Sequence, residues 1–502
     1  MFSRAIRASA ALLLFLPAAA PAQSDAPITA QDLRRHVEVL ASDRFEGREP
    51  TTEGERLTTA YIVEQFRARG LEPAAPGGGW LQPVPLVQRS TSAHRAGWRA
   101  AGRPIPFENT QIALQGNRPD VRIADAPVVF AGHGARIAER GIDQLAGADL
   151  RGAVVLILYD SPEVAGFPSF AERVAAVGQA GAGAVIAITA ADVQWRNVSA
   201  NYSQPSVKLA DQLLAPIVGA MPLQAAQRLI AAAGGDLGRL LNEQPGSSFR
   251  SVPLPLRADL QVSTEILPLT SNNVIGRLRG SGGGREALLL LGHWDHLGVC
   301  RGPEERDRIC NGAVDNASGI AALIEVAGRL SRGTRPVRDI LFMATTVEER
   351  GLLGAEYFTR HPAVPLQSIV AAVNLDTMAI AGAGRPIDYS GRGNVALDAA
   401  IAAAAAAQGR VVAPDGPAAQ YEQRNDAWAL AHAGVPAVGL VGGAFSDTER
   451  LNAFLFERYH RPEDEVAAID LSGAAQDSDL LVALARRLAD PAQYQRRGGG
   501  RP

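Results

Sequence analysis

The sequence predicts an α/β protein whose main domain is a mostly parallel sheet flanked by helices. From about residue 262 onward, short apolar runs alternate with amphipathic or alanine-rich runs, as strands and helices do in such sheets. A polar residue able to bind metal or move protons follows nearly every predicted strand. Residues 121–255 contain short apolar strands but none of the candidate clusters discussed below, which indicates an inserted, smaller α/β or β-rich domain.

The expected elements follow from apolar periodicity and from capping residues. Residues 28–47 are predicted to form a helix with Thr29 as its N-cap and Asp32 three residues later, and 53–69 a second helix that ends at Gly70. Residues 71–120 give no clear pattern. The main domain is then expected to contain strands at 274–278, 287–291, 340–345, 369–375 and 437–441, and helices at 317–330, 395–408 and 471–489.

The first residues resemble a secretory signal. Arg4 and Arg7 precede the apolar run 10–20, and small residues at 20–22 offer a cleavage site before Gln23. The run is too short to span a bilayer, and no later stretch reaches the ~20 apolar residues that a transmembrane helix needs. We therefore expect a periplasmic or secreted protein without a membrane span.

Five segments are predicted in total. They are a signal peptide (1–22), an N-terminal part of the main domain (23–120), the insert (121–255), the main domain (256–490) and a disordered tail (491–502).

Charge and cysteine content narrow the range of possible functions further. The 49 basic residues nearly balance the 52 acidic ones, for a net charge of −3, and no basic run is present, so we expect no nucleic-acid partner. The only cysteines are Cys300 and Cys310, and an oxidising destination predicts that they form a disulfide. The oligomeric state is not predicted.

The polar residues after the strands are of types that bind divalent metals. Imidazoles and carboxylates from separate strand ends suit zinc, and a carboxylate has two oxygens with which to bridge two metals. The candidates, in chain order, are His293, Asp295, Asp315, Glu348, Glu349, Asp376, Tyr459 and His460.

Each candidate also has a structural interpretation when taken alone. Asp315 before a helix is typical of a cap, and Glu348 with Glu349 is typical of a solvated pair at a strand end. His293 alone is compatible with a buried histidine bonded to Asp295. Their occurrence in order, one group per strand end, favours a metal site.

These residues resemble the co-catalytic zinc aminopeptidases of metallopeptidase family 28. The pattern His293-Trp294-Asp295, then Asp315, then Glu348-Glu349, Asp376 and a late His460 is similar to that family's ordered ligand set. The opening 36–48, which ends in Glu46-Gly47-Arg48, is also similar. The 121–255 segment resembles the protease-associated insert of these enzymes.

The resemblance implies a zinc-exopeptidase fold, two zinc ions and peptide substrates. It assigns His293 and Asp376 to one zinc, Glu349 and His460 to the other, and Asp315 to both. It makes Glu348 the general base toward water. By the same resemblance Asp295 holds the His293 ring in its ligand tautomer, and Tyr459 donates to the oxyanion. His296 is expected to pack beside the ligands.

Other functions share parts of this pattern. Asn425-Asp426-Ala427 replaces the family's usual Ser-Asp-His, which leaves the substrate pocket unassigned. A carboxypeptidase or dipeptidase of the same fold has the same metal set. A non-catalytic peptide-binding protein or a single-zinc cyclase of N-terminal glutamine would be expected to have lost ligands, and here every position is filled.

Overall fold

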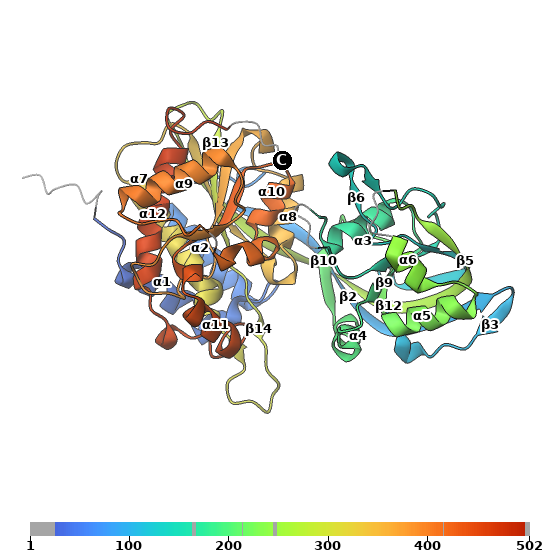
Figure 1. Cartoon of the computed structure of the whole chain (residues 1–502). Coiled ribbons are helices and arrows are strands. Elements are labelled where there is room, and N and C mark those ends of the chain that lie inside the picture. The colour runs from blue at the N-terminus through green and yellow to red at the C-terminus, as the bar shows by residue number, and fades with distance from the viewer. Residues whose placement is uncertain (1–25, 163–166, 213, 244–247, 415, 497–502) are drawn as a thin grey trace, which may run out of the picture.

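The computed structural model describes residues 26–162, 167–212, 214–243, 248–414 and 416–496. Two lobes lie side by side and are joined by long strands, as Figure 1 shows. The predicted signal peptide, with its cleavage site before Gln23, falls outside the described residues. Within the described part of the chain, no helix combines the length and apolarity needed to cross a bilayer.

The larger lobe is built on a mostly parallel sheet, which confirms the predicted fold class. Its parallel strands run in the order β19-β17-β13-β16, with β18 antiparallel at one edge and β12 antiparallel at the other. Their bounds are β13 (Ala287–His293), β16 (Asp339–Thr345), β17 (Ile369–Asn374), β18 (Asp388–Ser390), β19 (Ala437–Gly442) and β12 (Val252–Leu278). The predicted strands therefore coincide with the observed ones to within a residue or two at most ends, except that 274–278 is only the end of β12.

Helices cover both faces of this sheet because the side chains of each buried strand alternate between them. Leu288 and Leu290 of β13 face one core, whereas Leu289 and Leu291 face the other. The first core is covered by α1 (Ala30–Leu40), α2 (Glu53–Ala68), α7 (Gly319–Ser331), α9 (Val395–Ala407) and α12 (Ser472–Leu488). The second is covered by α8 (Leu353–Arg360) and α10 (Ala427–His432).

The first helix is shorter than predicted. Thr29 and Asp32 form the expected capping box, but α1 ends at Leu40 and the chain continues as a 3₁₀ turn, Asp43–Arg48. Glu46, Gly47 and Arg48 all have positive φ. At Gly47 a Cβ atom would lie 2.5 Å from the Cys310 carbonyl oxygen, so only glycine fits this close approach between segments.

The smaller lobe has its own parallel sheet and its own cores. The parallel strands lie in the order β5-β8-β9-β11, and β4 is antiparallel at the edge. Their bounds are β4 (Ala113–Gly116), β5 (Asp120–Phe130), β8 (Val154–Leu158), β9 (Ala184–Thr189) and β11 (Ile217–Pro222). The helices of this lobe are α3 (Phe170–Gln179), α4 (Trp195–Ser203), α5 (Leu223–Ala232) and α6 (Leu237–Glu243).

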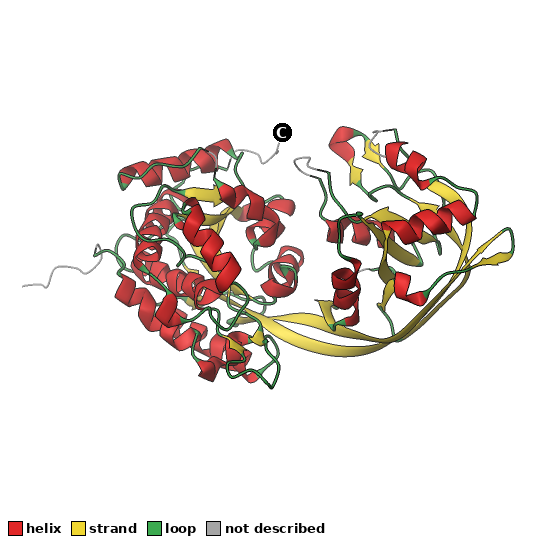
Figure 2. Ribbon diagram, turned by 60° about the horizontal axis from the view of Figure 1, so that its bottom comes forward, coloured by secondary structure: helices red, strands yellow, loops and turns green. Residues whose placement is uncertain are grey.

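Two long antiparallel strands belong to both lobes, as Figure 2 shows. Strand β2 (Leu81–Ala100) pairs along β12 from Leu81 opposite Val274 to Arg99 opposite Arg257. Trp98 and Val262 lie in the core of the smaller lobe. The predicted insert boundaries of 121–255 are therefore too narrow, because the strands that connect the lobes also contribute side chains to the inserted core.

The end of the chain also differs from its prediction. The tail was expected to be disordered from residue 491, yet Tyr494 is buried and Arg496 donates to the carbonyl of Gln367 at 2.8 Å and to that of Gly434 at 2.7 Å. A buried aromatic ring and a guanidinium bonded to main-chain carbonyls fix this segment on the larger lobe. Of the predicted tail 491–502, residues 497–502 lie outside the described residues.

Candidate metal centre

The candidate ligands meet at the carboxyl edge of the larger lobe's sheet. His293 is the last residue of β13, Asp376 follows β17, and Glu348 with Glu349 follows β16. Parallel strands bring their carboxyl ends to one edge, which is why residues far apart in sequence converge there. The His293 Nε2 atom lies 3.4 Å from Asp376 Oδ1 and 4.0 Å from Glu348 Oε2.

Asp315 lies between the two histidines. Its Oδ1 atom is 3.3 Å from His293 Nε2, and its Oδ2 atom is 3.3 Å from His460 Nε2. The residue is buried in the turn that enters α7, and its peptide bond to Asn316 is cis. Each of its two oxygens therefore faces a different imidazole, as a bridging carboxylate requires.

His460 comes from a loop near the end of the chain and faces Glu349. Its Nε2 atom is 2.9 Å from Glu349 Oε2. The neighbouring Tyr459 ring stacks on the His460 ring with centroids 3.8 Å apart. The hydroxyl of Tyr459 accepts a hydrogen bond from Arg424 at 3.1 Å, which leaves its own proton available to another acceptor.

Asp295 holds the glutamate turn rather than the His293 ring. Its carboxylate oxygens accept the backbone N–H groups of Glu348 at 3.1 Å and Glu349 at 3.4 Å. The Nδ1 atom of His293 is 3.8 Å from that carboxylate but 3.1 Å from the main-chain oxygen of Asp295. Asp295 was expected to contact the His293 ring through its carboxylate, but it does so through its main-chain carbonyl. The tight turn directs the carbonyl toward the ring and the carboxylate toward the two amides.

His296 packs beside the ligands, as expected, and contacts one of them directly. Its Nδ1 atom lies 2.6 Å from Glu349 Oε1, so the two oxygens of Glu349 face different histidines. The His296 ring is buried and lies edge-on to the His460 ring. This contact fixes the orientation of the Glu349 carboxylate.

The cluster concentrates more carboxylates than imidazoles in a largely buried site. Burial raises the pKa of Asp295 to about 7 and raises the pKa values of Glu348 and Asp376 above their ordinary range. Burial opposes protonation of His460, but the adjacent carboxylates of Asp315 and Glu349 raise its pKa to about 10. Such crowding of like charge is stabilised by a bound cation.

The residues present fit a pair of divalent metal ions. Asp376 Oδ1 and His460 Nε2 are buried and, although His293 and Glu349 lie close to them, neither atom makes a hydrogen bond of normal geometry with the described residues. Donor atoms of His293, Asp315 and Glu349, and of His293, Glu348 and Asp376, lie within 4.8 Å of one another. Mixed nitrogen and oxygen ligands of this kind suit zinc.

Three further residues organise the site and were not among the predicted candidates. Asp464 is buried, and its carboxylate accepts the N–H groups of Val314 at 3.0 Å and Asp315 at 3.1 Å. Asp426 is buried and accepts a hydrogen bond from the hydroxyl of Thr345, at the end of β16.

The third is Arg48, which is 1% exposed and joins the N-terminal segment to the ligand loops. Its guanidinium donates to the carbonyls of Leu40, Trp294, Asn311 and Gly312 at 2.6–3.0 Å. In the sequence, the only indication that Arg48 belongs to the site was its position in the Glu46-Gly47-Arg48 motif.

A small pocket opens beside Asp376 and Tyr459. Its cavity volume is about 40 Å³. The lining is mostly apolar or aromatic and consists of Asp376, Thr377, Ile380, Tyr421, Arg424, Phe445, Leu451, Phe454, Leu455 and Tyr459. The cavity is small, and its apolar and aromatic walls lie next to the candidate ligands.

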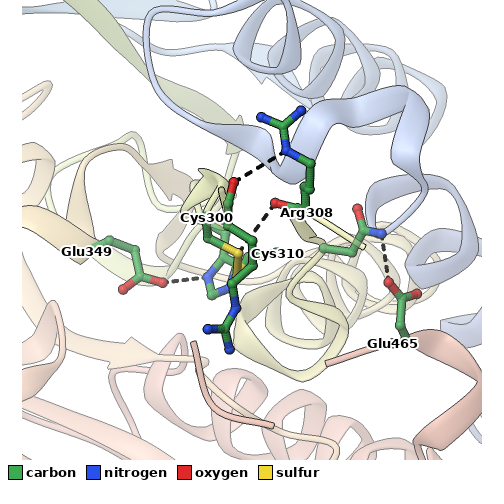
Figure 3. Close-up of a disulfide and its surroundings, with 8 residues drawn as sticks. Cys300, Arg308, Cys310, Glu349 and Glu465 are labelled. Atoms are coloured by element: carbon green, nitrogen blue, oxygen red, sulfur yellow. Dashed lines mark hydrogen bonds and ion pairs between the residues drawn. A yellow bond between two sulfur atoms is a disulfide. The ribbon is translucent and has the colours of Figure 1, made fainter. Parts of the chain in front are cut away.

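The predicted disulfide is present. Cys300 and Cys310 are bonded and close the hairpin formed by β14 (Gly298–Val299) and β15 (Ile309–Cys310). The hairpin lies between His293 and Asp315 in the chain, and Figure 3 shows the bridge with Glu349 to one side and Glu465 to the other.

We expect reduction of this bridge to lower the free energy of unfolding by about 3 kcal/mol at most, because the closed loop is short. Urea unfolding of the Cys300→Ser/Cys310→Ser variant against the parent chain measures this loss. In the unreduced parent, neither thiol should react with iodoacetamide in denaturant, and alkylation of both would contradict the bridge.

Comparison with known proteins agrees with this geometry. The fold and the cluster of histidines and carboxylates indicate a metallopeptidase domain, and residues 273–485 match the model of peptidase family M28. This region of the chain belongs to peptidase family M28, as the sequence pattern predicted. The described ligands from His293 to His460 all lie within the matched residues.

The curated relatives match over short stretches. A vacuolar membrane protease of Candida glabrata is 34% identical over 114 residues, which is 23% of this chain and 10% of that protein. Aminopeptidase NAALADL1 of Mus musculus is 32% identical over 139 residues, which is 26% of this chain and 17% of that protein. The chain thus aligns with less than a quarter of the length of either relative.

One solved structure resembles the whole fold. An aminopeptidase from an Aneurinibacillus species aligns with a TM-score of 0.52 and 18% identity, covering 95% of this chain and 98% of that one. This likeness includes both lobes and confirms the fold.

Proposed function

We propose that this chain is an exported aminopeptidase that uses two zinc ions to remove N-terminal residues from peptides. The observation that carries the proposal is Asp315, whose two oxygens each face a different histidine inside a peptidase family M28 domain. The signal-like sequence at 1–22 and the disulfide support export to an oxidising compartment.

The distances support the assignment of ligands to two metals. His293 and Asp376 would hold one zinc, Glu349 and His460 the other, with Asp315 binding both. Zinc in such a site supplies Lewis-acid polarisation of the scissile carbonyl and lowers the pKa of the attacking water.

Glu348 is the proposed general base. Its carboxylate lies within the cluster, 4.0 Å from His293 Nε2, and its turn is fixed by the bonds from Asp295 to the amides. A raised pKa suits a group that must accept a proton from water and then donate it to the leaving amine. Tyr459, whose hydroxyl proton is not used by Arg424, is placed to donate to the developing oxyanion.

The smaller lobe would control access or recognition and take no part in bond cleavage. The ligand candidates all lie in the larger lobe, and we infer that the smaller one corresponds to a protease-associated insert. On this proposal, shortening the lobe changes activity on long peptides more than on aminoacyl reporters.

Removal of metal is expected to abolish activity, and added zinc or cobalt to restore it. The physical reason is that imidazole and carboxylate donor atoms converge within 4.8 Å of one another, and a bound cation would offset the like charge of the carboxylates. Metal analysis of the active chain should approach two zinc ions per chain, and activity without any bound transition metal would refute the proposal.

The type of exopeptidase is tested with a matched set of peptides. A free-N-terminus peptide, its N-acetylated form and its C-amidated form are compared for hydrolysis. We expect acetylation to abolish cleavage and amidation to leave it. The reverse result identifies a carboxypeptidase, and binding without turnover identifies a peptide-binding protein.

A further inference from the structure

A second cavity, remote from the ligand cluster in sequence, gathers unpaired cationic groups. Its volume is about 240 Å³, and it lies in the smaller lobe between α3, α4 and the β2–β10 pair, where β10 spans Ser206–Leu209. Figure 1 shows β10 beside β2, where the lobes meet. A single buried water needs only about 10–15 Å³ on the same measure, so this space is much larger than a water site requires.

Strand register places the charged residues on one face. Ser206 lies directly opposite Arg89, and Lys208 is two residues further along β10. Because side chains alternate along a strand, Arg89, Ser206 and Lys208 share a face of this pair, and all three line the cavity. Lys208 is the only lysine of the chain.

The described part of the chain gives these cations no close ionic partner. Arg89 is 3% exposed, and its Nε atom has no hydrogen-bond partner among the described residues. No described carboxylate lies within 4 Å of Arg89 or Lys208, although the more distant Glu356 acts on Lys208 electrostatically. Burial lowers the pKa values of both groups. Arg89 is buried and Lys208 is half-buried, and cations so placed without a close anion are costly to the free protein.

Further hydrogen-bond donors line the same cavity. Gln115 is buried, its Oε1 atom accepts from Ser206 at 2.7 Å, and its Nε2 atom has no partner in the described structure. Burial raises the pKa of Tyr202, so this cavity-lining hydroxyl keeps its proton. Among the described residues, Gln115 Nε2 and Arg89 Nε are thus buried donors without an acceptor.

The rest of the lining is apolar. Phe170, Val174 and Leu214 form part of the wall. A hydrated inorganic anion gains nothing from such a wall, whereas an anion attached to an apolar body uses both surfaces. We infer that Arg89, Lys208 and Gln115 form a binding site for a carboxylate group attached to an apolar side chain or ring.

The carboxylate has two possible sources, a free organic acid or the C-terminal residue of a peptide. The cavity shares Ala171 and Gln212 with a larger one of about 460 Å³ between the lobes. That larger cavity is also lined by Gly351 and Leu352, which closely follow the Glu348-Glu349 pair. The two cavities are therefore adjacent, and the larger one lies against the residues that follow the glutamate turn.

Direct binding tests the site with the metal-loaded chain. The probe is N-acetylphenylalanine, which has a carboxylate and an apolar ring but no free amine for an aminopeptidase to act on. We expect saturable binding by calorimetry, weakened about tenfold or more by Lys208→Met or Arg89→Met, since each removes a charged hydrogen bond. The matched control is Arg118→Met, because Arg118 is exposed on the same lobe.

Thermal unfolding separates a binding role from a structural one. Without ligand, Lys208→Met should keep or raise the Tm, because it removes a desolvated charge that has no partner. The probe should raise the Tm of the parent chain and not that of the variant. A Tm lowered by Lys208→Met in ligand-free buffer, equal probe binding by parent and variant, or binding of inorganic phosphate in place of the probe would overturn the inference.

The source of the carboxylate is found with substrates. Peptides ending in phenylalanine are compared as free acids and as amides for KM in the parent and in Lys208→Met. A lower KM for the free acid that disappears in Lys208→Met identifies the peptide C-terminus. Equal KM values in the parent, together with probe binding that depends on Lys208, identify a free acid. The KM comparison rests on the proposed aminopeptidase function, whereas the calorimetric and thermal-unfolding experiments do not.

Discussion

Glu348→Gln is expected to lower kcat by about 10²–10⁴-fold while the chain keeps both zinc ions. The change removes the proton acceptor but keeps the size of the side chain. The turn that carries Glu348 is held by its backbone N–H groups, which donate to Asp295. These bonds do not involve the Glu348 carboxylate, so the substitution leaves them in place. KM should change little.

Glu349→Gln is expected to behave differently although the residues are adjacent. Its two oxygens face His296 at 2.6 Å and His460 at 2.9 Å. In the glutamine variant an NH₂ group replaces one of these oxygens, so one histidine loses its acceptor and is repelled. We expect loss or weakening of one zinc and a lower Tm, since a metal that binds only the native state stabilises it.

Metal content, kcat and Tm measured on both variants decide between these roles. Glu449→Gln provides the control, because Glu449 is an exposed residue of helix α11 (Thr448–Glu457) and should change none of the three. Near-normal turnover in Glu348→Gln, or loss of metal from that variant instead of from Glu349→Gln, would show that the assignment of roles is wrong.

Arg48→Met is expected to lower the free energy of unfolding by about 3–5 kcal/mol, the cost of breaking a buried charged network. The side chain is 1% exposed and donates to the carbonyls of Trp294, Asn311 and Gly312. Methionine fills the space but leaves those acceptors unsatisfied. Because these carbonyls belong to the loops that carry His293 and Asp315, zinc affinity should fall as well.

A matched control exists in the other lobe. Arg173 is also fully buried and donates to the carbonyls of His133 at 2.9 Å and Leu158 at 2.7 Å. Arg173→Met should destabilise the smaller lobe and leave the zinc content unchanged. Denaturant unfolding and metal analysis on both variants test this, and equal zinc loss from both, or a stable and fully loaded Arg48→Met, would contradict it.

The elements predicted best are those whose environment is uniform along their length. Strands such as β13 and β17 are buried on both faces and appear in the sequence as unbroken apolar runs. Strand β2 escaped prediction because Pro83 and Pro85 interrupt its pattern. Both prolines lie outside the stretch that pairs in register with β10, and on that side Pro85 only accepts, from the N–H of Ala210 at 3.0 Å, so no proline N–H is needed there.

The sequence alone determined the metal-binding residue types and their order, because strand ends of a parallel sheet converge wherever that sheet forms. It thereby predicted that His293, Asp315, Asp376 and the glutamate pair would meet, and that the cysteines would be joined. These inferences needed only local pattern and topology.

Only the tertiary structure decided which groups hold those residues in place. Asp464 reaches the amide of Asp315 across 149 residues of sequence, and Arg48 reaches Trp294 across 246. Both act on backbone groups, which are the same in every residue and leave no mark in the partner's sequence. The same holds for Arg89 and Lys208, whose shared face follows from strand pairing and from no motif that the sequence displays.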